Sequence, residues 1–236
     1  MRVRSLVADD LAWVVDLAAR RAEQRQSFAP TFWRRAPDAR RAHTEYLSSL
    51  IADPAVPAVR TDHTFAFGLP RPGFLLVDDA AAERADRWAT EGAALLRRLV
   101  GESRVRLVCP VPEPDRTALA VELGLRRAET WWHRDLAGPR ASDFQDGASL
   151  QVPGARGRLV RSPAVYAPGG PVLLVTEFHG RRALAEMERE AASHGAAVSV
   201  VAQAAGDGVC EELLLRIGYR RTCDFYEGTV IGTGRR

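Results

Sequence analysis

One short segment has residue types that suit phosphate binding. Residues 87–93 read Arg-Trp-Ala-Thr-Glu-Gly-Ala, follow the strand-like run GFLLV and the polar loop DDAAAERAD, and lead into an apolar helical run. The unpaired N–H groups of a helix N-terminus and the helix dipole favour an anion there, and small residues let a pyrophosphate approach the backbone. The alternative is a plain amphipathic helix, in which Leu95, Leu96 and Leu99 pack inward and Gly92 permits close packing.

Carboxylates follow two of the expected strands and are the candidates for acid–base chemistry. Asp78 and Asp79 come directly after GFLLV, and Glu113 follows the run VRLVCPV. Ligands of open α/β sheets bind at the carboxyl ends of the strands. We therefore expect Asp78, Asp79 or Glu113 to act as a general base or to recognise an amine; a solvated loop is the alternative. Cys109 and His133 are interpreted as packing residues rather than as a nucleophile or a base.

The elements that must position these residues alternate between helices and strands. Residues 2–6 predict a first strand, residues 10–26 and 38–51 predict helices, and residues 59–77 predict two or three strands. A helix ending at Gly101, a buried strand at 105–111 and a helix ending at Gly124 follow, and residues 125–136 predict one long strand or a bent pair of strands. The stretch 137–157 is rich in Gly, Pro and Ser and is typical of a linker.

The sequence then repeats itself at an offset of 94 positions. VRLVCPVPEPDRTALAVELGLRRAETWW lies over SVVAQAAGDGVCEELLLRIGYRRTCDFY, with Gly101 over Gly195 and Gly124 over Gly218. This register predicts two copies of one unit with the order strand, helix, strand, helix, strand. Chance alignment of Ala- and Arg-rich segments is the alternative.

The first part of the chain resembles the GNAT (GCN5-related) N-acetyltransferases. In that family a pyrophosphate loop of the pattern Gln/Arg-x-x-Gly-x-Gly/Ala follows the fourth strand and leads into an Ala-Leu-Leu run. Here Arg87, Thr90 and Gly92 fall on the pattern, Ala94-Leu95-Leu96 falls on the run, and the element order of residues 2–136 also matches. The resemblance implies an α/β (mixed α+β) fold, a central mixed sheet flanked by helices and followed by a second, half-GNAT-like repeat. The expected division is a first domain at 1–138, a linker at 139–157 and a degenerate second repeat at 158–236.

The resemblance also implies a cofactor and a site. The co-substrate would be acetyl-CoA, with no metal. Backbone amides near the fourth strand would polarise the thioester carbonyl. The residues expected at the cofactor are Leu76, Val77, Arg87, Trp88, Ala89, Thr90, Glu91, Gly92 and Ala93.

Several positions depart from the family pattern. Thr90 replaces a Gly, Glu113 stands where the family often has Asn, and the usual Tyr of the following helix is Ala120 in the first copy and Leu214 in the second. The second copy has Leu184 and Glu186 at the positions of Thr90 and Gly92. A carboxylate about 4 Å from a phosphate charge costs on the order of 4 kcal/mol at an effective dielectric near 20. The phosphate site is therefore expected in the first copy.

The leading hypothesis is acetyl transfer from acetyl-CoA to the amine of an unknown small molecule or peptide, by direct attack in a ternary complex. The first alternative is a non-catalytic binding or regulatory module with the same fold. The missing Tyr residues and the altered loop favour it. The second alternative is a structural or interaction protein that binds no CoA.

Composition restricts the class of protein and its partners. The chain has 236 residues, 46% hydrophobic and 27% charged, which is typical of a globular protein. All 33 basic residues are Arg, the net charge is +3, and the basic residues are interspersed with acidic ones, so a nucleic-acid partner is not expected. The Arg and Ala bias indicates a GC-rich bacterial genome. No apolar run suits a membrane span or signal peptide. We expect a cytoplasmic monomer or homodimer without a membrane partner.

Overall fold

The computed structural model describes residues 1–137 and 144–230, which form two compact units. The first unit contains residues 1–24, 40–128 and the chain from Asp224 onward, and the second contains residues 25–39 and 129–223. These units are defined by contacts between residues and not by the sequence repeat. The linear division into a first domain, a linker and a second repeat therefore stays a prediction.

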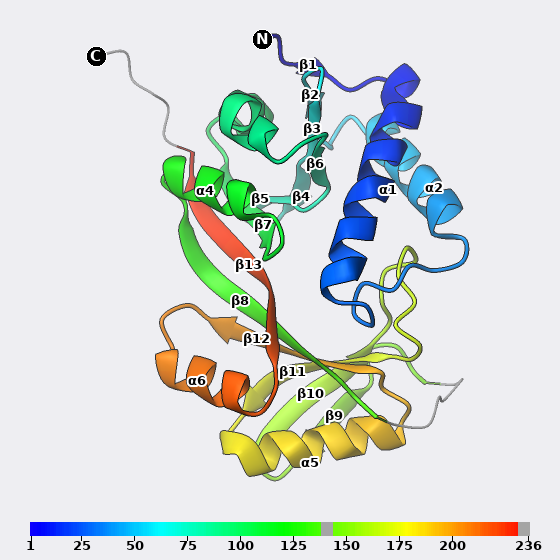
Figure 1. The fold of residues 1–236 in the computed structure, drawn as a ribbon, viewed down its shortest axis with the longest axis vertical. Helices are drawn as coiled ribbons and strands as arrows, with labels where there is room; N and C mark the ends of the chain where they lie inside the picture. Colours follow the sequence, from blue (N-terminus) through cyan, green and yellow to red (C-terminus); the bar gives the residue numbers. More distant parts are fainter. Residues whose placement is uncertain (138–143, 231–236) are drawn as a thin grey trace. The chain divides into compact units, whose positions relative to one another are not determined.

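Helices α1 (Leu11–Phe28) and α2 (Ala39–Ala52) follow a short 3-10 helix at Ala8–Asp10 and lie against one layer of strands (Figure 1). Apolar residues of α1 recur at helical spacing, and Val14 and Leu17 are buried together with Leu47 of α2. Phe65 and Phe67 belong to the same core. This cluster fixes α1 and α2 on their strands.

Two sets of strands make up the sheets of the first unit. β1 (Arg4–Ser5), β2 (Ala58–Arg60), β3 (Thr64–Phe67) and β6 (Ala80–Ala82) are hydrogen-bonded in that order. β4 (Leu69–Arg71), β5 (Phe74–Val77) and β7 (Arg104–Pro110) form the second set, in the order β4-β5-β7-β13. β5 and β7 are parallel, as expected for a strand–helix–strand connection. The connection contains a π-helical turn at Trp88–Gly92 and α3 (Ala93–Val100), and α4 (Pro114–Glu122) follows β7.

The second unit contains strands that are consecutive neighbours within one sheet, with two helices packed on one face. Its strand order is β8-β12-β11-β10-β9, from β8 (Arg126–Asp135), β9 (Ser149–Val152), β10 (Ala155–Val160), β11 (Val172–Phe178) and β12 (Val198–Ala204). α5 (Gly180–Ser193) and α6 (Gly208–Arg216) cover a core that includes Trp132, Leu173, Leu184 and Met187. β8 and β13 (Arg220–Thr229) each contribute residues to both units.

Part of the stretch expected from composition to be a linker forms regular strands. Residues 149–152 and 155–157 lie in β9 and β10, whereas residues 139–143 of the expected linker lie outside the described residues. In β10, Ala155, Gly157 and Leu159 are buried and alternate with exposed Arg156 and Arg158. Because two of the buried residues are Ala and Gly, the alternation of buried and exposed residues that is typical of a strand cannot be recognised from composition.

The expected repeat is visible in the bounds of the elements. β7, α4 and β8 correspond to β12, α6 and β13 when every bound is shifted by 94 residues. Gly124 and Gly218 both have a positive φ, at 78° and 89°, and both follow the last turn of a helix. β11 and β12 are parallel like β5 and β7. The chain therefore contains two copies of one strand–helix–strand–helix–strand unit, and the mixed α/β class expected from the sequence is confirmed.

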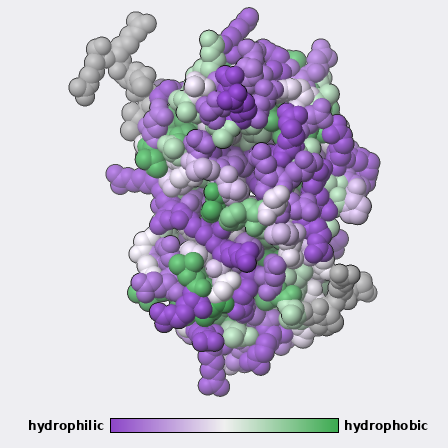
Figure 2. Space-filling model, viewed as in Figure 1, coloured by the Kyte–Doolittle hydropathy of each residue, from purple (hydrophilic) through white to green (hydrophobic). Residues whose placement is uncertain are grey.

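The surface is largely polar. Hydrophilic residues cover most of the face shown in Figure 2. Among the described residues, the large apolar side chains that remain exposed are Met1, Val7, Tyr46, Val121, Val209 and Leu215. No helix of the described chain has the length and apolar character needed to cross a membrane.

Candidate functional site

The candidate site of the first unit lies where β5 separates from β7. Leu75, Leu76 and Val77 pair with β7 in parallel register, whereas Ala80 and the residues after it pair with β3. Leu76 and Val77, the residues expected to contact the thioester, therefore belong to the paired part of β5. The carbonyl groups that follow have lost β7 as a neighbour and need other donors.

Arg116 supplies those donors. It lies in the first turn of α4, and its side chain is completely buried. Nη2 donates to the carbonyl oxygens of Val77 at 3.1 Å and of Asp78 at 3.3 Å, and Nη1 donates to the carbonyl oxygen of Ala80 at 3.2 Å. The guanidinium carbon also lies 5.4 Å from the centre of the Trp88 ring. Arg116 therefore joins α4 to the backbone of residues 77–80 at the point where the strands separate.

Glu113 supplies a negative charge between this buried guanidinium and the guanidinium of Arg21. Glu113 Oε2 lies 3.7 Å from Arg116 Nη1, and Glu113 Oε1 accepts a 2.6 Å hydrogen bond from Arg21 Nε. Arg21 Nη1 also donates to the Asp78 carbonyl oxygen at 3.1 Å. Buried charges are tolerated only when they are paired and hydrogen-bonded. Glu113, a candidate base in the sequence, is therefore held between two arginines and fixes Arg116 in place.

Asp79 belongs to a different group, which includes two residues of α2. Its carboxylate lies 3.7 Å from His43 Nε2, and the Tyr46 hydroxyl hydrogen-bonds to it. Burial alone raises the pKa of Asp79, but hydrogen bonds from His43 and Tyr46 and the charge of Arg21 give a net lowering. The side chains of Asp79 and His43 are 24% and 17% exposed, so the pair is partly accessible to solvent. A His–carboxylate pair of this kind can accept a proton from an ammonium group.

Residues 87–93 do not form an exposed loop before a helix. The backbone is already helical at Arg87, the Arg87 and Trp88 amides donate to the carbonyl oxygens of Arg84 and Ala85, and π-helical bonding continues to Gly92. The expectation of open amides at Arg87–Gly92 is therefore corrected, because the helix starts earlier than its small residues suggest. The assignment of Arg87–Ala93 to cofactor binding stays a prediction.

The side chains of this turn are engaged with the protein itself. Glu91 is buried and interacts with Thr61, with Thr64 at 3.3 Å and with Arg87 at 3.4 Å. Gly92 packs so closely that an added Cβ would lie 2.4 Å from Cδ2 of Leu119. Thr90 and Ala89 are exposed, and the Thr90 hydroxyl lies 3.4 Å from the Asp86 carbonyl oxygen. The polar atoms of this turn thus have partners within the first unit.

Two other candidates have structural positions. Cys109 is completely buried in the core of the first unit, and burial raises the pKa of its thiol to about 12. His133, in the second unit, is buried next to Thr222 and stacks on Phe32. Both placements agree with the packing interpretation.

Sequence reasoning missed Arg21, His43, Tyr46 and Arg116. The spacing of His43 and Tyr46 by three residues on a predicted helix places both side chains on one face, and that was the available signal. Arg21 and Arg116 resemble the many surface arginines of this chain, and only their burial distinguishes them. All four contact residues that are distant in sequence.

Comparison with solved structures identifies the fold. A GCN5-related N-acetyltransferase from Sphaerobacter thermophilus is 14% identical over 99% of this chain and 97% of that chain, with a TM-score of 0.57. A candidate acetyltransferase from Thermoplasma acidophilum is 11% identical over 97% of this chain and all of that chain, with a TM-score of 0.57. The chain has the GNAT fold. A candidate acetyltransferase from Pyrococcus horikoshii, 11% identical over 98% of this chain and 89% of that chain, gives a TM-score of 0.55. No family model and no curated protein matches the sequence.

The GNAT fold implies acetyl-CoA between the separating strands, and the residues of the first repeat do not fit it. Arg116 already binds the carbonyl oxygens of residues 77, 78 and 80 and lies over Trp88. The turn expected to hold the pyrophosphate is helical and contains a buried carboxylate, Glu91. This carboxylate is paired with Arg87, the first residue of the expected loop, at 3.4 Å.

Proposed function

We propose that this chain is a GNAT-fold binding or regulatory module whose first repeat does not transfer acetyl groups. The observation that carries the proposal is the burial of Arg116 against the carbonyl oxygens of Val77, Asp78 and Ala80. A buried guanidinium with three acceptors and a nearby carboxylate is costly to displace, because the three carbonyl groups would each lose a charged donor and Glu113 would lose one of its two cations. The helical turn with buried Glu91 supports the same conclusion.

The test is calorimetric titration of the purified chain with acetyl-CoA. We expect no binding at high micromolar concentration. Thr90→Glu is the matched variant, because Thr90 is exposed and the substitution adds a negative charge at the turn without entering the core. Binding by the wild type that Thr90→Glu weakens would place a phosphate at this turn and overturn the proposal. Gly92→Glu suits this purpose less well, since Gly92 packs against Leu119.

A second candidate function is N-acetyl transfer from acetyl-CoA to an amine acceptor by direct attack in a ternary complex. The His43–Asp79 pair favours it, because a partly exposed imidazole oriented by a carboxylate suits proton removal from an ammonium group. Arg116 would have to leave the carbonyl groups of residues 77–80 in that case. Release of free CoA thiol with a panel of amines tests the candidate. Amine-dependent release that His43→Ala abolishes, with an unchanged fold, would favour transfer over the non-catalytic module.

A further inference from the structure

A small cavity in the second unit has no role in the function proposed above. Its volume is about 220 Å³, below the roughly 300 to 1,000 Å³ of pockets for drug-sized ligands. It is lined by Pro30, His133, Arg134, Asp135, Gly218 and Arg220. All six residues belong to the second unit. The cavity is large enough for a small metabolite and too small for a nucleotide cofactor.

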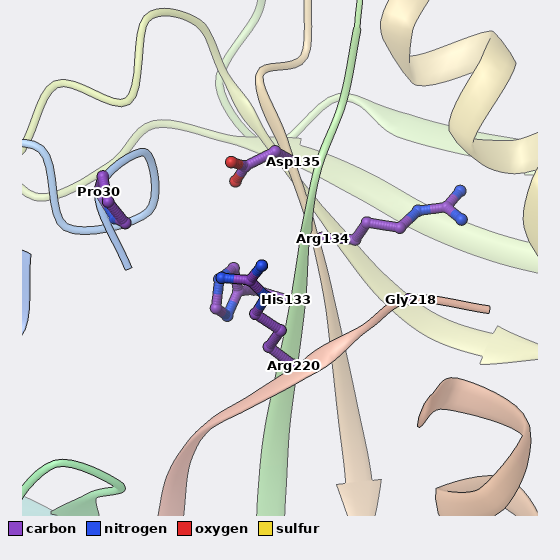
Figure 3. Close-up of a pocket in the computed structure, with 6 residues that line it drawn as sticks. All are labelled: Pro30, His133, Arg134, Asp135, Gly218 and Arg220. Carbon is purple, nitrogen blue, oxygen red and sulfur yellow. The ribbon is translucent and has the colours of Figure 1, made fainter. Parts of the chain in front are cut away.

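The side chains of β8 alternate between the cavity and the core. In Figure 3, His133 and Asp135 project to the side of β8 that faces Pro30, and the Arg220 side chain extends toward His133 on that side. Arg134 points the opposite way, where its guanidinium binds Glu188 and donates to the Ile217 carbonyl oxygen at 2.9 Å. The charged groups available to a ligand are therefore Asp135 and Arg220.

These two charges have opposite signs and do not pair with each other. The Asp135 carboxylate accepts a 2.8 Å hydrogen bond from the Thr31 hydroxyl, and among the described residues it has no cation within 4.0 Å. Within the same described ranges, 1–137 and 144–230, no carboxylate lies within that distance of the Arg220 guanidinium. Both residues are exposed on the surface, so a ligand can reach them.

His133 adds a polar wall without adding charge. Its ring is 4% exposed, stacks on Phe32 at 5.3 Å and contacts the Thr222 hydroxyl through Nδ1. Burial lowers the pKa of His133 and the charge of Arg220 lowers it further, whereas Asp135 acts in the opposite direction. The net lowering keeps the imidazole neutral at pH 7, so the cavity has one positive and one negative group.

We propose that this cavity binds a small zwitterion, such as a free α-amino acid, with the ligand's ammonium group at Asp135 and its carboxylate at Arg220. A simple anion would be repelled by Asp135 and a simple cation by Arg220, whereas a zwitterion forms a favourable pair with each. The Thr31 hydrogen bond holds the Asp135 carboxylate in one orientation, and Pro30 provides apolar contact. The inference concerns the second unit and does not depend on whether the first repeat binds acetyl-CoA.

The experiment is titration of the full chain with glycine, L-serine and L-glutamine at millimolar concentration, monitored by calorimetry and by the shift in thermal midpoint. Acetate and methylammonium serve as single-charge analogues. We expect at least one amino acid to bind and both analogues to bind at least tenfold more weakly. Arg220→Gln and Asp135→Asn should each weaken amino-acid binding at least tenfold. Arg182→Gln, at an exposed position of α5, is the control and should leave it unchanged.

Two outcomes would overturn the proposal. One is the absence of binding by every amino acid tested. The other is equal binding of acetate or methylammonium, which would show that one charge alone is recognised. The analogue series requires only wild-type protein and remains decisive if a variant fails to fold. Because acetyl-CoA is absent from this assay, its result is separate from that of the acetyl-CoA titration.

Discussion

The guanidinium of Arg116 donates to the carbonyl oxygen of Val77 at 3.1 Å, across the point where β5 separates from β7. One side chain from α4 thereby satisfies a strand end that has lost its neighbouring strand. The same guanidinium binds the Asp78 and Ala80 carbonyl oxygens and lies near Glu113. Arg116 therefore connects α4 to the backbone of residues 77–80, and we expect its removal to destabilise the first unit.

Replacement of Arg116 by Ala should destabilise the chain by about 3 to 5 kcal/mol, because Glu113 loses one of its two cations and the carbonyl oxygens of residues 77, 78 and 80 lose a charged donor. Urea unfolding followed by tryptophan fluorescence measures this change. Arg98→Ala, at an exposed position of α3, is the control and should change stability by no more than about 0.5 kcal/mol. A loss for Arg116→Ala as small as that of the control would contradict the central role assigned to this residue.

Gly92 and Leu119 should show strong energetic coupling. An added Cβ at Gly92 would lie 2.4 Å from Leu119 Cδ2, and Leu119 is buried. Overpacking of this kind costs typically about 1 to 3 kcal/mol, while the higher helix propensity of Ala returns up to about 1 kcal/mol. Gly92→Ala should therefore destabilise the wild type. In the Leu119→Ala background the same substitution should be neutral or stabilising, and additive effects in this double-mutant cycle would contradict the contact.

Much of the fold could be predicted because its signals are local. β7, α4 and β8 were indicated by a buried apolar run, a helical pattern ending in Gly124 and an alternating strand, and the repeat at an offset of 94 confirmed the order. The start of the helix before Gly92 was misplaced, because small residues suit both an open phosphate loop and a tightly packed turn. β9 and β10 were missed because Gly154 and Gly157 suggested a linker.

The candidate site was less predictable, since it depends on contacts between distant elements. Asp79 was a candidate base by its position after a strand, but its partner His43 comes from α2, whose packing the periodicity does not determine. Arg116 was placed on a helix without any signal that it is buried. In a chain whose basic residues are all Arg, residue type alone cannot distinguish a buried guanidinium from a solvated one.

The acid limb of the stability curve should depend on Asp10. The hydrogen bond from Arg4, together with the Val7 amide and Arg60, lowers the pKa of Asp10 to about 2, although burial acts in the opposite direction. A carboxyl whose pKa is lower in the folded state stabilises the fold above its unfolded pKa of about 3.9, and this contribution is lost as the pH falls toward the folded value.

The stability difference between wild type and Asp10→Asn should therefore be constant above about pH 5 and shrink between about pH 4 and pH 2. Urea unfolding at a series of pH values measures it. Asp9→Asn, at the exposed neighbouring position, should show no such dependence. A difference that stays constant down to pH 2 would mean that the Asp10 carboxyl is not stabilised in its ionised form.

The thiols of Cys109 and Cys210 should react slowly with alkylating reagents in the native chain. Burial raises the pKa of Cys109 to about 12, partly offset by the charge of Arg116, and burial raises the pKa of Cys210 to about 11. Since the thiolate is the reactive species, about one Cys109 in ten thousand is reactive at pH 8 even before access is considered. Iodoacetamide labelling read by mass spectrometry should therefore modify Cys210 slowly and Cys109 hardly at all, whereas both should react rapidly in urea.

Cys109→Ser is the control that identifies the Cys109 peptide. Faster labelling of Cys109 in the native chain than in urea would indicate an activated nucleophile and would require a catalytic interpretation of the loop that joins β7 to α4.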